Sequence, residues 1–360
     1  MIVVFVMAAV LWGMGIALKA PHRARWVMIG GLMASVLGLH LLLPDGHPLR
    51  EGTGSEPELW LLILGFGGLI WLYRLGLRWL KSKQAPPPQS PTPNGPNPTE
   101  LERNARHIVL REIGGPGQSR LKAAKVLVIG AGGLGASALQ YLAAAGVGTI
   151  GVIDDDVVEN SNLARQVIHR DRDIGLPKVF SAQAAMEAQN PFVTVRPFHR
   201  RLDRSIARDL FTEFDLILDG TDDTDTRYLV NETAVALGIP LISGALSQWE
   251  GQLTIFDPKR ATPCYRCIFP TPAAPGLAPS CAQAGVLGPL PGIIGTMMAA
   301  EAIKLLSGAG TPLLGQMLIY DAQDALSRKI KLTANADCPV CGADAPPASS
   351  KTAPNLKGPR

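Results

Sequence analysis

The chain has 360 residues, with 34 lysines and arginines against 30 aspartates and glutamates, and 47% of its residues are hydrophobic. Disordered proteins combine low hydrophobicity with high net charge, so a net charge of +4 on this composition excludes a disordered chain. The length allows two or three units of about 100–200 residues each.

The surplus of positive charge lies entirely in the first quarter of the chain. Residues 1–99 hold eight basic and four acidic side chains, which leaves 26 of each sign in the remainder. A nucleic-acid-binding domain carries a basic surface of its own. Since the remainder of the chain is balanced, we expect no nucleic-acid partner.

Residues 1–80 contain three apolar segments. Segments 1–18 and 26–43 carry no Asp, Glu, Lys or Arg, and Arg74 and Arg78 can extend segment 59–73 to Leu80 by snorkelling. About 20 apolar residues cross a bilayer as a helix. A core helix or a signal peptide is the alternative for a single segment, but three in succession predict a membrane anchor with three transmembrane helices.

The charges between these segments predict the orientation of the anchor. The first loop carries Lys19, Arg23 and Arg25 and no acid, whereas residues 45–58 hold four acids and one arginine. Because basic loops stay on the cytoplasmic side, we place the N-terminus outside and everything after residue 80 in the cytoplasm. The chain is thus expected to be a multi-pass protein of the inner (cytoplasmic) membrane.

Two segments are predicted to lie outside any folded unit. Residues 81–99 are rich in proline, which favours extended polyproline II, and read as a linker. Residues 343–360 have a similar composition and are predicted to form a disordered tail.

Residues 100–342 alternate between strand and helix patterns, which predicts one α/β domain with a doubly wound, mostly parallel, Rossmann-like sheet. Strands are expected at Lys125–Ile129, Thr149–Asp154, Leu216–Leu218, Ile239–Ala245 and Gly251–Phe256, and a late helix at Ile293–Ser307.

A glycine-rich loop follows the first of these strands. Gly130, Gly132, Gly133 and Gly135 stand before an apolar helix, and Asp154 ends the next strand about 20 residues later. Glycines let backbone N–H groups approach a phosphate, and the acid suits a ribose hydroxyl. By itself this pattern indicates a nucleotide, most often NAD.

A second group of acids follows the strand at Leu216–Leu218. Asp219, Asp222 and Asp223 lie at the edge where open α/β sheets bind ligands, and Mg²⁺ prefers carboxylates together with phosphate oxygens. A helix N-cap with solvated acids is the competing interpretation for Asp223 and Asp225.

Four cysteines form two C-x-x-C pairs, Cys264 with Cys267 and Cys338 with Cys341. Two such pairs predict a closed, tetrahedral and structural Zn²⁺ site. Disulfides are disfavoured in the cytosol, and a redox dithiol needs only one pair. The fifth cysteine, Cys281, lies in a loop rich in proline and glycine and is either an accessible, activatable thiol or an unreactive one.

Taken together, residues 100–342 resemble the MoeB/ThiF/HesA family, the bacterial relatives of ubiquitin-activating enzymes. The matching motifs, in the order of the family, are RNARHIVL, GAGGLG, DDDVVENSNLARQ, GLPK, TDD, SGA, GQLTIF and both cysteine pairs. Asn104 replaces the family's usual Tyr, and Asp223 replaces its usual Asn. The resemblance implies ATP rather than NAD as the nucleotide.

The family reaction is adenylation. By resemblance, a ubiquitin-like sulfur carrier with a C-terminal Gly-Gly attacks the α-phosphate of Mg-ATP, and pyrophosphate leaves. The resemblance assigns catalysis to Arg106, Arg165, Lys178, Asp222 and Cys281. It assigns nucleotide binding to Gly130, Gly132, Gly133, Gly135, Asp154, Asp156, Ser161, Asn162, Leu163, Ala164, Arg165, Lys178, Asp222 and Asp223. Arg106 matches the arginine that reaches into the partner's site, which implies a homodimer.

The most similar branch is the molybdopterin-synthase adenylyltransferase. The alternatives are the adenylyltransferase of thiazole (thiamine) biosynthesis, a tRNA-modifying dehydratase, which fits the two cysteine pairs less well, and an inactive membrane scaffold for the carrier. A scaffold has no physical need for the Arg, Lys and Asp set. No rhodanese-like domain is recognised in the sequence, so a separate sulfur donor is expected.

Overall fold

The computed structural model describes residues 2–18, 20–54, 57–83, 97–260, 262–272 and 284–342. Its contacts divide the chain into two compact units, Met1–Pro93 and Asn94–Arg360, and each is considered by itself. Cys281, the predicted tail 343–360 and residues 84–96 of the predicted linker lie outside the described residues.

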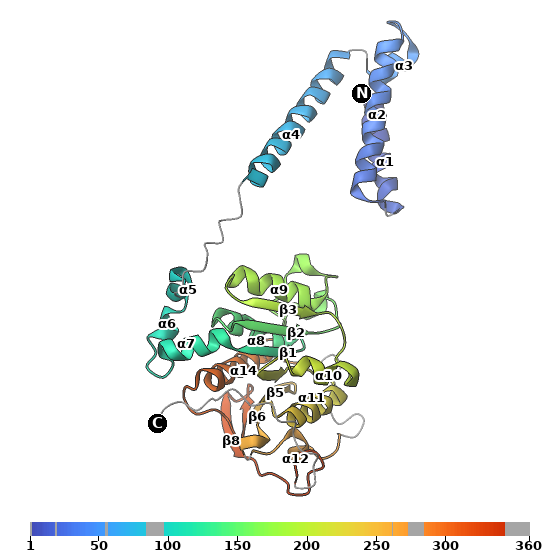
Figure 1. Cartoon of the computed structure of the whole chain (residues 1–360). Coiled ribbons are helices and arrows are strands. Elements are labelled where there is room, and N and C mark those ends of the chain that lie inside the picture. The colour runs from blue at the N-terminus through green and yellow to red at the C-terminus, as the bar shows by residue number, and fades with distance from the viewer. Residues whose placement is uncertain are drawn as a thin grey trace. The chain divides into compact units, whose positions relative to one another are not determined.

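The first unit is helical (Figure 1). It consists of α1 (Ile2–Ala17), α2 (His22–Leu42), α3 (Pro48–Thr53) and α4 (Pro57–Lys83). Its buried apolar cluster consists of Val4, Val36 and Trp60. Many other large apolar side chains are exposed, among them Phe5, Val27, Leu42 and Phe66.

The prediction of three membrane-spanning helices was wrong in number. Among the described helices of this unit, only α2 is long and apolar enough to cross a membrane, over Ala24–Leu42. The 16 residues of α1 rise about 24 Å, which is short of a hydrocarbon core about 30 Å thick. The apolar part of α4, Trp60–Gly76, is also short.

The second unit is built on an eight-stranded sheet with the order β3-β2-β1-β4-β5-β6-β7-β8. The strands are β1 (Lys125–Ile129), β2 (Thr149–Ile153), β3 (Thr194–Phe198), β4 (Leu216–Asp219), β5 (Leu241–Leu246), β6 (Glu250–Phe256), β7 (Gln316–Asp321) and β8 (Leu326–Lys331).

The sheet is mixed rather than mostly parallel. The pairs from β3 to β5 are parallel, and β5–β6, β6–β7 and β7–β8 are antiparallel. Parallel neighbours need a long crossover, whereas a few residues can join antiparallel ones. Only three residues separate β5 from β6 and four separate β7 from β8, so the chain turns back without a helix.

Helices cover both faces of the sheet, as the doubly wound prediction requires (Figure 1). They are α5 (Pro98–Arg103), α6 (Ala105–Ile108), α7 (Gly114–Ala123), α8 (Gly133–Ala144), α9 (Lys178–Gln189), α10 (Arg204–Phe211), α11 (Thr224–Leu237), α12 (Tyr265–Ile268) and α14 (Pro289–Ser307). Short 3₁₀ turns lie at Asn160–Asn162, Asp171–Asp173 and Pro258–Arg260.

Alternation along β1 shows how the two faces are filled. Val126 and Val128 join the core beneath α7, α8, α9 and α14, while Leu127 and Ile129 join the core beneath α10 and α11. Successive side chains of a strand point to opposite faces. An apolar run without alternation must therefore be covered on both sides, as residues 126–129 of β1 are.

Candidate functional site

A cleft of about 750 Å³ lies at the carboxyl ends of the parallel strands. Ten of the predicted nucleotide residues line it: Gly130, Gly132, Gly133, Asp154, Asp156, Asn162, Arg165, Lys178, Asp222 and Asp223. The tertiary structure therefore brings together residues that are up to 93 positions apart in the sequence.

The glycine-rich loop has the conformation that a phosphate-binding loop needs. Gly130 has φ +88°, a left-handed conformation that favours glycine. Gly132 is the N-cap of α8 and makes no side-chain cap, and Gly132 and Gly133 line the cleft, so backbone N–H groups of the first turn are available to an anion. A Cβ atom on Gly135 would lie 1.9 Å from the carbonyl oxygen of Gly130. Gly135 thus serves the packing of α8 on the loop and does not line the cleft.

Asp154 fixes this loop to the end of β2. Its two carboxylate oxygens accept hydrogen bonds from the backbone N–H of Ala131, at 2.7 Å, and from that of Asp156, at 2.8 Å. The carboxylate remains on the wall of the cleft. Asp154 is thus placed beside the glycine loop, where a nucleotide ribose lies in folds of this type.

Two cations stand where phosphates would bind. Lys178 begins α9, and its ammonium group is buried and donates to Asp156 Oδ2 at 2.7 Å. Arg165 donates to the Ser161 carbonyl at 3.0 Å and to Asn162 Oδ1 at 3.3 Å. Since a buried ammonium is unfavourable without a partner, the ion pair with Asp156 stabilises the Lys178 side chain on the wall of the cleft.

The three acids at the end of β4 and just after it do not form the predicted metal cluster. Asp219 is buried, accepts from the Thr221 N–H and hydroxyl groups, and pairs with Arg227 at 3.8 Å. Asp223 is the N-cap of α11, as the competing interpretation held. Asp222 alone is exposed in the cleft.

The capping bonds change the acidity of Asp223. Burial raises the pKa of its carboxyl group, but hydrogen bonds from Thr226 and the charge of Arg201 outweigh burial and hold that pKa below its usual value. An ionised carboxylate is the better cap, because it accepts from backbone N–H groups at the positive end of the helix.

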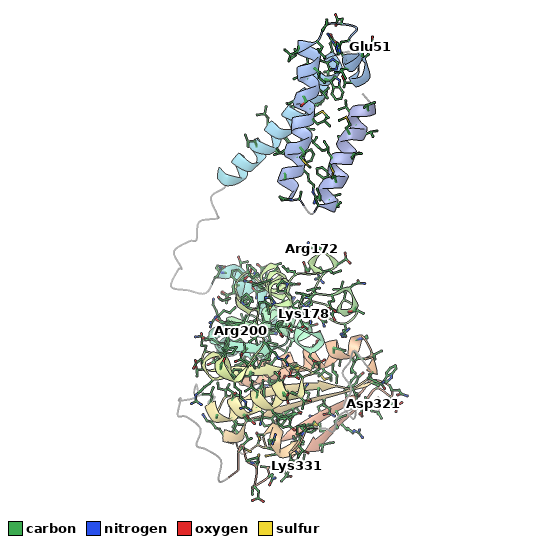
Figure 2. All side chains as sticks on the ribbon, turned by 90° about the vertical axis from the view of Figure 1, so that its right-hand side faces the viewer. Glu51, Arg172, Lys178, Arg200, Asp321 and Lys331 are labelled. Atoms are coloured by element: carbon green, nitrogen blue, oxygen red, sulfur yellow. The ribbon has the colours of Figure 1, made fainter. Side chains whose placement is uncertain are left out.

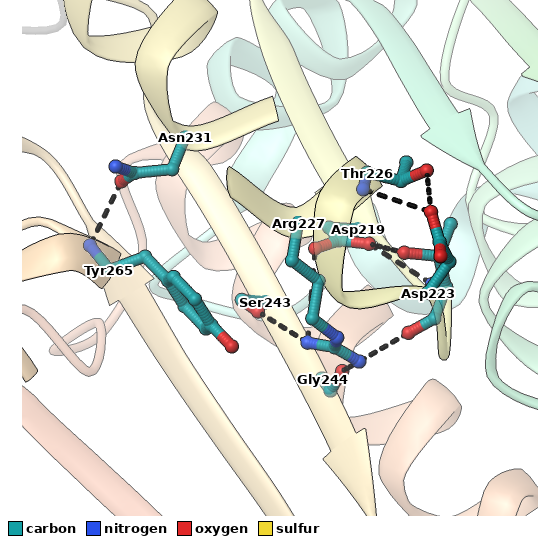
Figure 3. Close-up of polar contacts among 9 residues, drawn as sticks. Asp219, Asp223, Thr226, Arg227, Asn231, Ser243, Gly244 and Tyr265 are labelled. Atoms are coloured by element: carbon teal, nitrogen blue, oxygen red, sulfur yellow. Dashed lines mark hydrogen bonds and ion pairs between the residues drawn. The ribbon is translucent and has the colours of Figure 1, made fainter. Parts of the chain in front are cut away.

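Arg227 holds the segment that carries Asp222, and sequence analysis missed it (Figure 3). Its guanidinium donates to the carbonyls of Thr221 and Gly244 and to Ser243 Oγ. One buried side chain therefore joins the ends of β4 and β5. An arginine four residues after a predicted N-cap is the signal that could have indicated it.

Arg200 and Arg201 also line the cleft without having been predicted. Arg200 and Lys178, both of which line the cleft, are labelled in Figure 2. Arg201 pairs with Asp223 at 3.4 Å, and Arg200 lies 3.9 Å from Asp203. They follow β3, a strand that the sequence did not reveal, so their position at the sheet edge could not be anticipated.

His169 is hydrogen-bonded to the backbone of the glycine-rich loop. Its Nε2 lies 2.9 Å from the carbonyl of Ala131, which can only accept, so Nε2 carries a proton. Its Nδ1 lies 2.9 Å from Ser181 Oγ, which in turn lies 2.8 Å from Asp173 Oδ2. Burial lowers the pKa of His169.

Several predicted residues lie away from the cleft. Ser161 and Ala164 are exposed and Leu163 is half-buried, and none of the three lines the cleft. Arg106, on α6, is also exposed and does not line this chain's own cleft.

The two C-x-x-C pairs meet, although 74 positions separate them. The Sγ atoms of Cys264 and Cys338 are 3.6 Å apart, those of Cys267 and Cys341 3.3 Å, and those of Cys264 and Cys267 3.9 Å. Zn–S bonds of about 2.3 Å place tetrahedral ligands about 3.8 Å apart. The four sulfurs therefore fit a tetrahedral metal site.

Burial raises the pKa of the Cys264 thiol to about 11 and raises that of Cys341 as well. These thiols keep their protons at neutral pH unless a cation displaces them. Metal binding there would accordingly release protons and weaken at low pH.

Comparison with known proteins identifies the family. A model described as the ThiF family matches residues 104–340. The chain belongs to the ThiF family. Its sequence is 49% identical over 247 residues to the sulfur carrier protein adenylyltransferase of Thermus thermophilus, covering 68% of this chain and 91% of that one.

Two further relatives are similar over a comparable length of this chain. The SAMP-activating enzyme E1 of Haloferax volcanii is 49% identical over 244 residues, covering 68% of this chain and 90% of that one. The adenylyltransferase and sulfurtransferase MOCS3 of Arabidopsis thaliana is 45% identical over 250 residues, covering 69% of this chain but only 54% of that longer protein.

Solved structures support the fold of this ThiF-family domain. The complex of Escherichia coli MccB with AMPCPP and MccA has a TM-score of 0.60 at 23% identity, covering 69% of this chain and 75% of that one. PaaA has a TM-score of 0.59 at 25% identity, covering 83% and 90%.

Proposed function

We propose that this chain uses ATP to adenylate the C-terminal carboxylate of a ubiquitin-like sulfur carrier and releases pyrophosphate. The observation that carries the proposal is the 49% identity to proteins named as sulfur carrier adenylyltransferase and as a SAMP-activating E1, over 90% or more of their length. The cleft supports it, because it combines a glycine loop with fixed cations.

The reaction requires mainly that the carrier carboxylate and the triphosphate of ATP be correctly positioned. A carboxylate oxygen of the carrier forms a bond to the α-phosphorus of ATP, and the bond from that phosphorus to the β-phosphate oxygen breaks. Negative charge moves onto the pyrophosphate. Lys178 and Arg165 line the cleft where they would stabilise that charge, and the glycine loop would orient the triphosphate.

Magnesium fits the oxygen donors of the cleft. Asp154, Asp155 and Asp156 bring carboxylate oxygens within 4.8 Å of one another, and Asp222 is exposed and lines the same cleft. These residues would hold Mg²⁺, which would neutralise phosphate charge.

Exchange of labelled pyrophosphate into ATP, dependent on a carrier ending in Gly-Gly, tests the reaction. We expect Lys178→Met to lower the exchange rate about 10²- to 10³-fold, since a fixed donor to developing charge is removed. Lys122→Met is the matched control, because Lys122 is also ion-paired, with Glu100, but does not line the cleft. Absence of exchange with every carrier of the organism would contradict the proposal.

We propose the molybdopterin-synthase small subunit as the carrier, with the thiazole-pathway carrier as the alternative. Exchange that occurs only with the thiazole carrier would select the alternative. Binding of a carrier without exchange would select the inactive scaffold.

The role of Cys281 stays a prediction. A Cys281→Ala variant with unchanged adenylation and sulfur transfer would remove Cys281 from the mechanism.

We propose that the active form is a homodimer in which Arg106 reaches the partner's cleft. Exposed apolar side chains support it. Val109 and Leu110 follow Arg106, and Val167, Ile174 and Phe180 lie on the segment beside the cleft. Mixing Arg106→Ala with Lys178→Met subunits should restore activity in part, because one of the two sites becomes complete. No restoration would place Arg106 outside the reaction.

We propose Zn²⁺ as the metal of the four-cysteine cluster. All four ligands are sulfur and their spacing fits tetrahedral coordination. Elemental analysis of the purified chain should give one zinc per chain, and a different metal or none would contradict this identity.

We propose that the first unit anchors the chain to the membrane, with α2 as a spanning helix. The exposed apolar side chains of α1, α2 and α4 support this, because a water-soluble surface rarely carries so many. Deleting residues 1–96 should move the protein to the soluble fraction and leave the exchange rate unchanged. Membrane recovery of the shortened chain would contradict the proposal.

A further inference from the structure

Helix α11 touches both the cleft and the cysteine cluster. Arg227 faces the cleft, and Asn231 lies four residues later, on the same face of the helix. Asn231 is completely buried and uses both ends of its amide. Its Nδ2 lies 3.7 Å from Cys264 Sγ, and its Oδ1 accepts from the Tyr265 N–H at 2.9 Å (Figure 3).

The first cysteine pair carries a wall of the cleft. Tyr265 follows Cys264 directly, and its ring packs against Tyr228 at 5.3 Å, Phe256 at 6.0 Å and Phe269 at 4.8 Å between centroids. All four rings line the cleft. Tyr228 Oη also donates to the Phe269 carbonyl at 2.8 Å, which joins α11 to the residues after α12.

This wall lies on the opposite side of β1 from the ribose acid. Asp154 follows β2, whereas the aromatic residues follow β4 and β6, and the sheet order places β2 and β4 on opposite sides of β1. The floor on the aromatic side is the row Ser243, Thr254 and Met317, which pair across β5, β6 and β7. A nucleotide held by the glycine loop and Asp154 leaves this half of the cleft for the second substrate.

We propose that the four-cysteine cluster, through Asn231 and Tyr265, positions the wall that receives the Gly-Gly tail of the carrier. The inference rests on the proposed adenylation function and adds a role for the metal site in recognising the carrier. Asn231 is a positioning residue, because it acts through Cys264 and Tyr265 and does not line the cleft. A glycine tail has no side chains of its own, so flat aromatic faces can approach its backbone closely.

The test compares Asn231→Ala with Asn190→Ala in the full chain. Asn190 is also buried and also bridges two elements with its amide, to the Ala143 carbonyl at 2.7 Å and the Phe192 N–H at 3.2 Å, but on the other side of the domain. The readouts are KM for the carrier and for ATP in pyrophosphate exchange. The anisotropy of a labelled peptide ending in Gly-Gly and the rate of metal release to a chelator complete the set.

We expect Asn231→Ala to raise KM for the carrier and Kd for the peptide about tenfold, within the range of coupling between sites. KM for ATP should stay within about twofold, and metal release should be faster. By reciprocity, bound peptide should raise the affinity of the wild-type chain for the metal, measured by competition with the chelator. Asn190→Ala should lower stability without separating the two KM values.

Two results would overturn the proposal. Faster metal release from Asn231→Ala with an unchanged KM for the carrier and Kd for the peptide would make the cluster purely structural. Equal rises of both KM values in the two variants would indicate general destabilisation. If the wild-type chain binds the peptide but catalyses no exchange, the adenylation function fails while the tail-binding wall stands. Absence of peptide binding by the wild-type chain would overturn the wall as well.

Discussion

Two helical segments of 19 residues, Ala24–Leu42 in α2 and Pro289–Ser307 in α14, satisfy the same length and hydropathy criteria for a membrane span. In α14, 61% of the segment is buried within its own unit, whereas in α2 only 11% is buried. Ile294 and Met298 of α14 pack against α8 and the sheet, while Val27 and Leu42 of α2 are exposed.

This difference shows that an apolar helix needs to be covered, but that its sequence does not say whether protein or lipid covers it. In the second unit, eight strands and their helices supply enough apolar surface to cover α14. In the first unit, the buried cluster that contains Val36 of α2 has only two further buried members, Val4 and Trp60. An exposed apolar helix needs lipid or another protein as cover, and this supports the membrane proposal for α2.

Charge placed on each helix should separate the two environments most strongly. Ile294→Asp buries an unpaired carboxylate in α14, and we expect it to lower the free energy of unfolding of the second unit by about 4 kcal/mol or more. Val27→Asp in α2 should leave that unit's thermal unfolding and exchange rate unchanged, because Val27 belongs to the other unit. Unfolding of the second unit by Val27→Asp would mean that the units depend on one another.

Removing a ligand of the cysteine cluster should have the next largest effect. Cys338→Ala leaves three ligands, and we expect loss of the metal and a fall of more than about 3 kcal/mol in the free energy of unfolding of the second unit. Membrane recovery of the chain should not change, since α2 holds no ligand. An unchanged melting temperature in the metal-free variant would show that the four thiols pack stably without an ion.

The smallest expected effect on stability comes from the cap at the N-terminus of a helix. Asp223 caps α11 with its side chain, whereas Pro21 before α2 makes no side-chain cap. Asp223→Ala should cost about 1 kcal/mol at pH 7. Asp225→Ala is the matched control, because Asp225 lies in the same first turn without capping it.

The pH dependence of the cap follows from the lowered pKa of Asp223. Because the folded pKa lies below the unfolded one, the stabilisation is fully present above the unfolded value of about 3.9 and is lost as the pH falls through the folded value. The difference between wild type and Asp223→Ala should therefore shrink toward zero near pH 2. A difference that persists there would exclude the ionised cap.

Local patterns predicted the central strands well and the outer ones poorly. Residues 126–129 of β1 and 216–218 of β4 are apolar runs covered on both faces, and their sequences show it. The strand β3 contains Arg196 and Pro197, and every residue of β8 is exposed. An edge strand pairs with a neighbour on one side only, and its other side is open. Its sequence therefore carries no continuous apolar pattern.

Local patterns likewise predicted one part of the candidate site and not the other. The glycine spacing and the acid at Asp154 predicted a nucleotide site, because both depend on a single strand, turn and helix. For Asp223 the sequence left two interpretations open, metal ligand or N-cap, and the structure selects the cap, which accepts from the Thr226 N–H. The burial of Asp219 beside Arg227 could not be predicted, because it depends on a partner brought by folding. Arg200 and Arg201 reach the cleft only through the placement of β3.

The sequence by itself determined the family, the glycine-rich loop, the two cysteine pairs and the apolar character of α2 and α14, since each is a matter of residue type and spacing. Only the tertiary structure decided which apolar helix is covered by protein and which acids are free to meet a ligand. It also decided that the cysteine cluster supports an aromatic wall of the cleft through Asn231. These outcomes depend on contacts between residues distant in the chain, and no local pattern contains them.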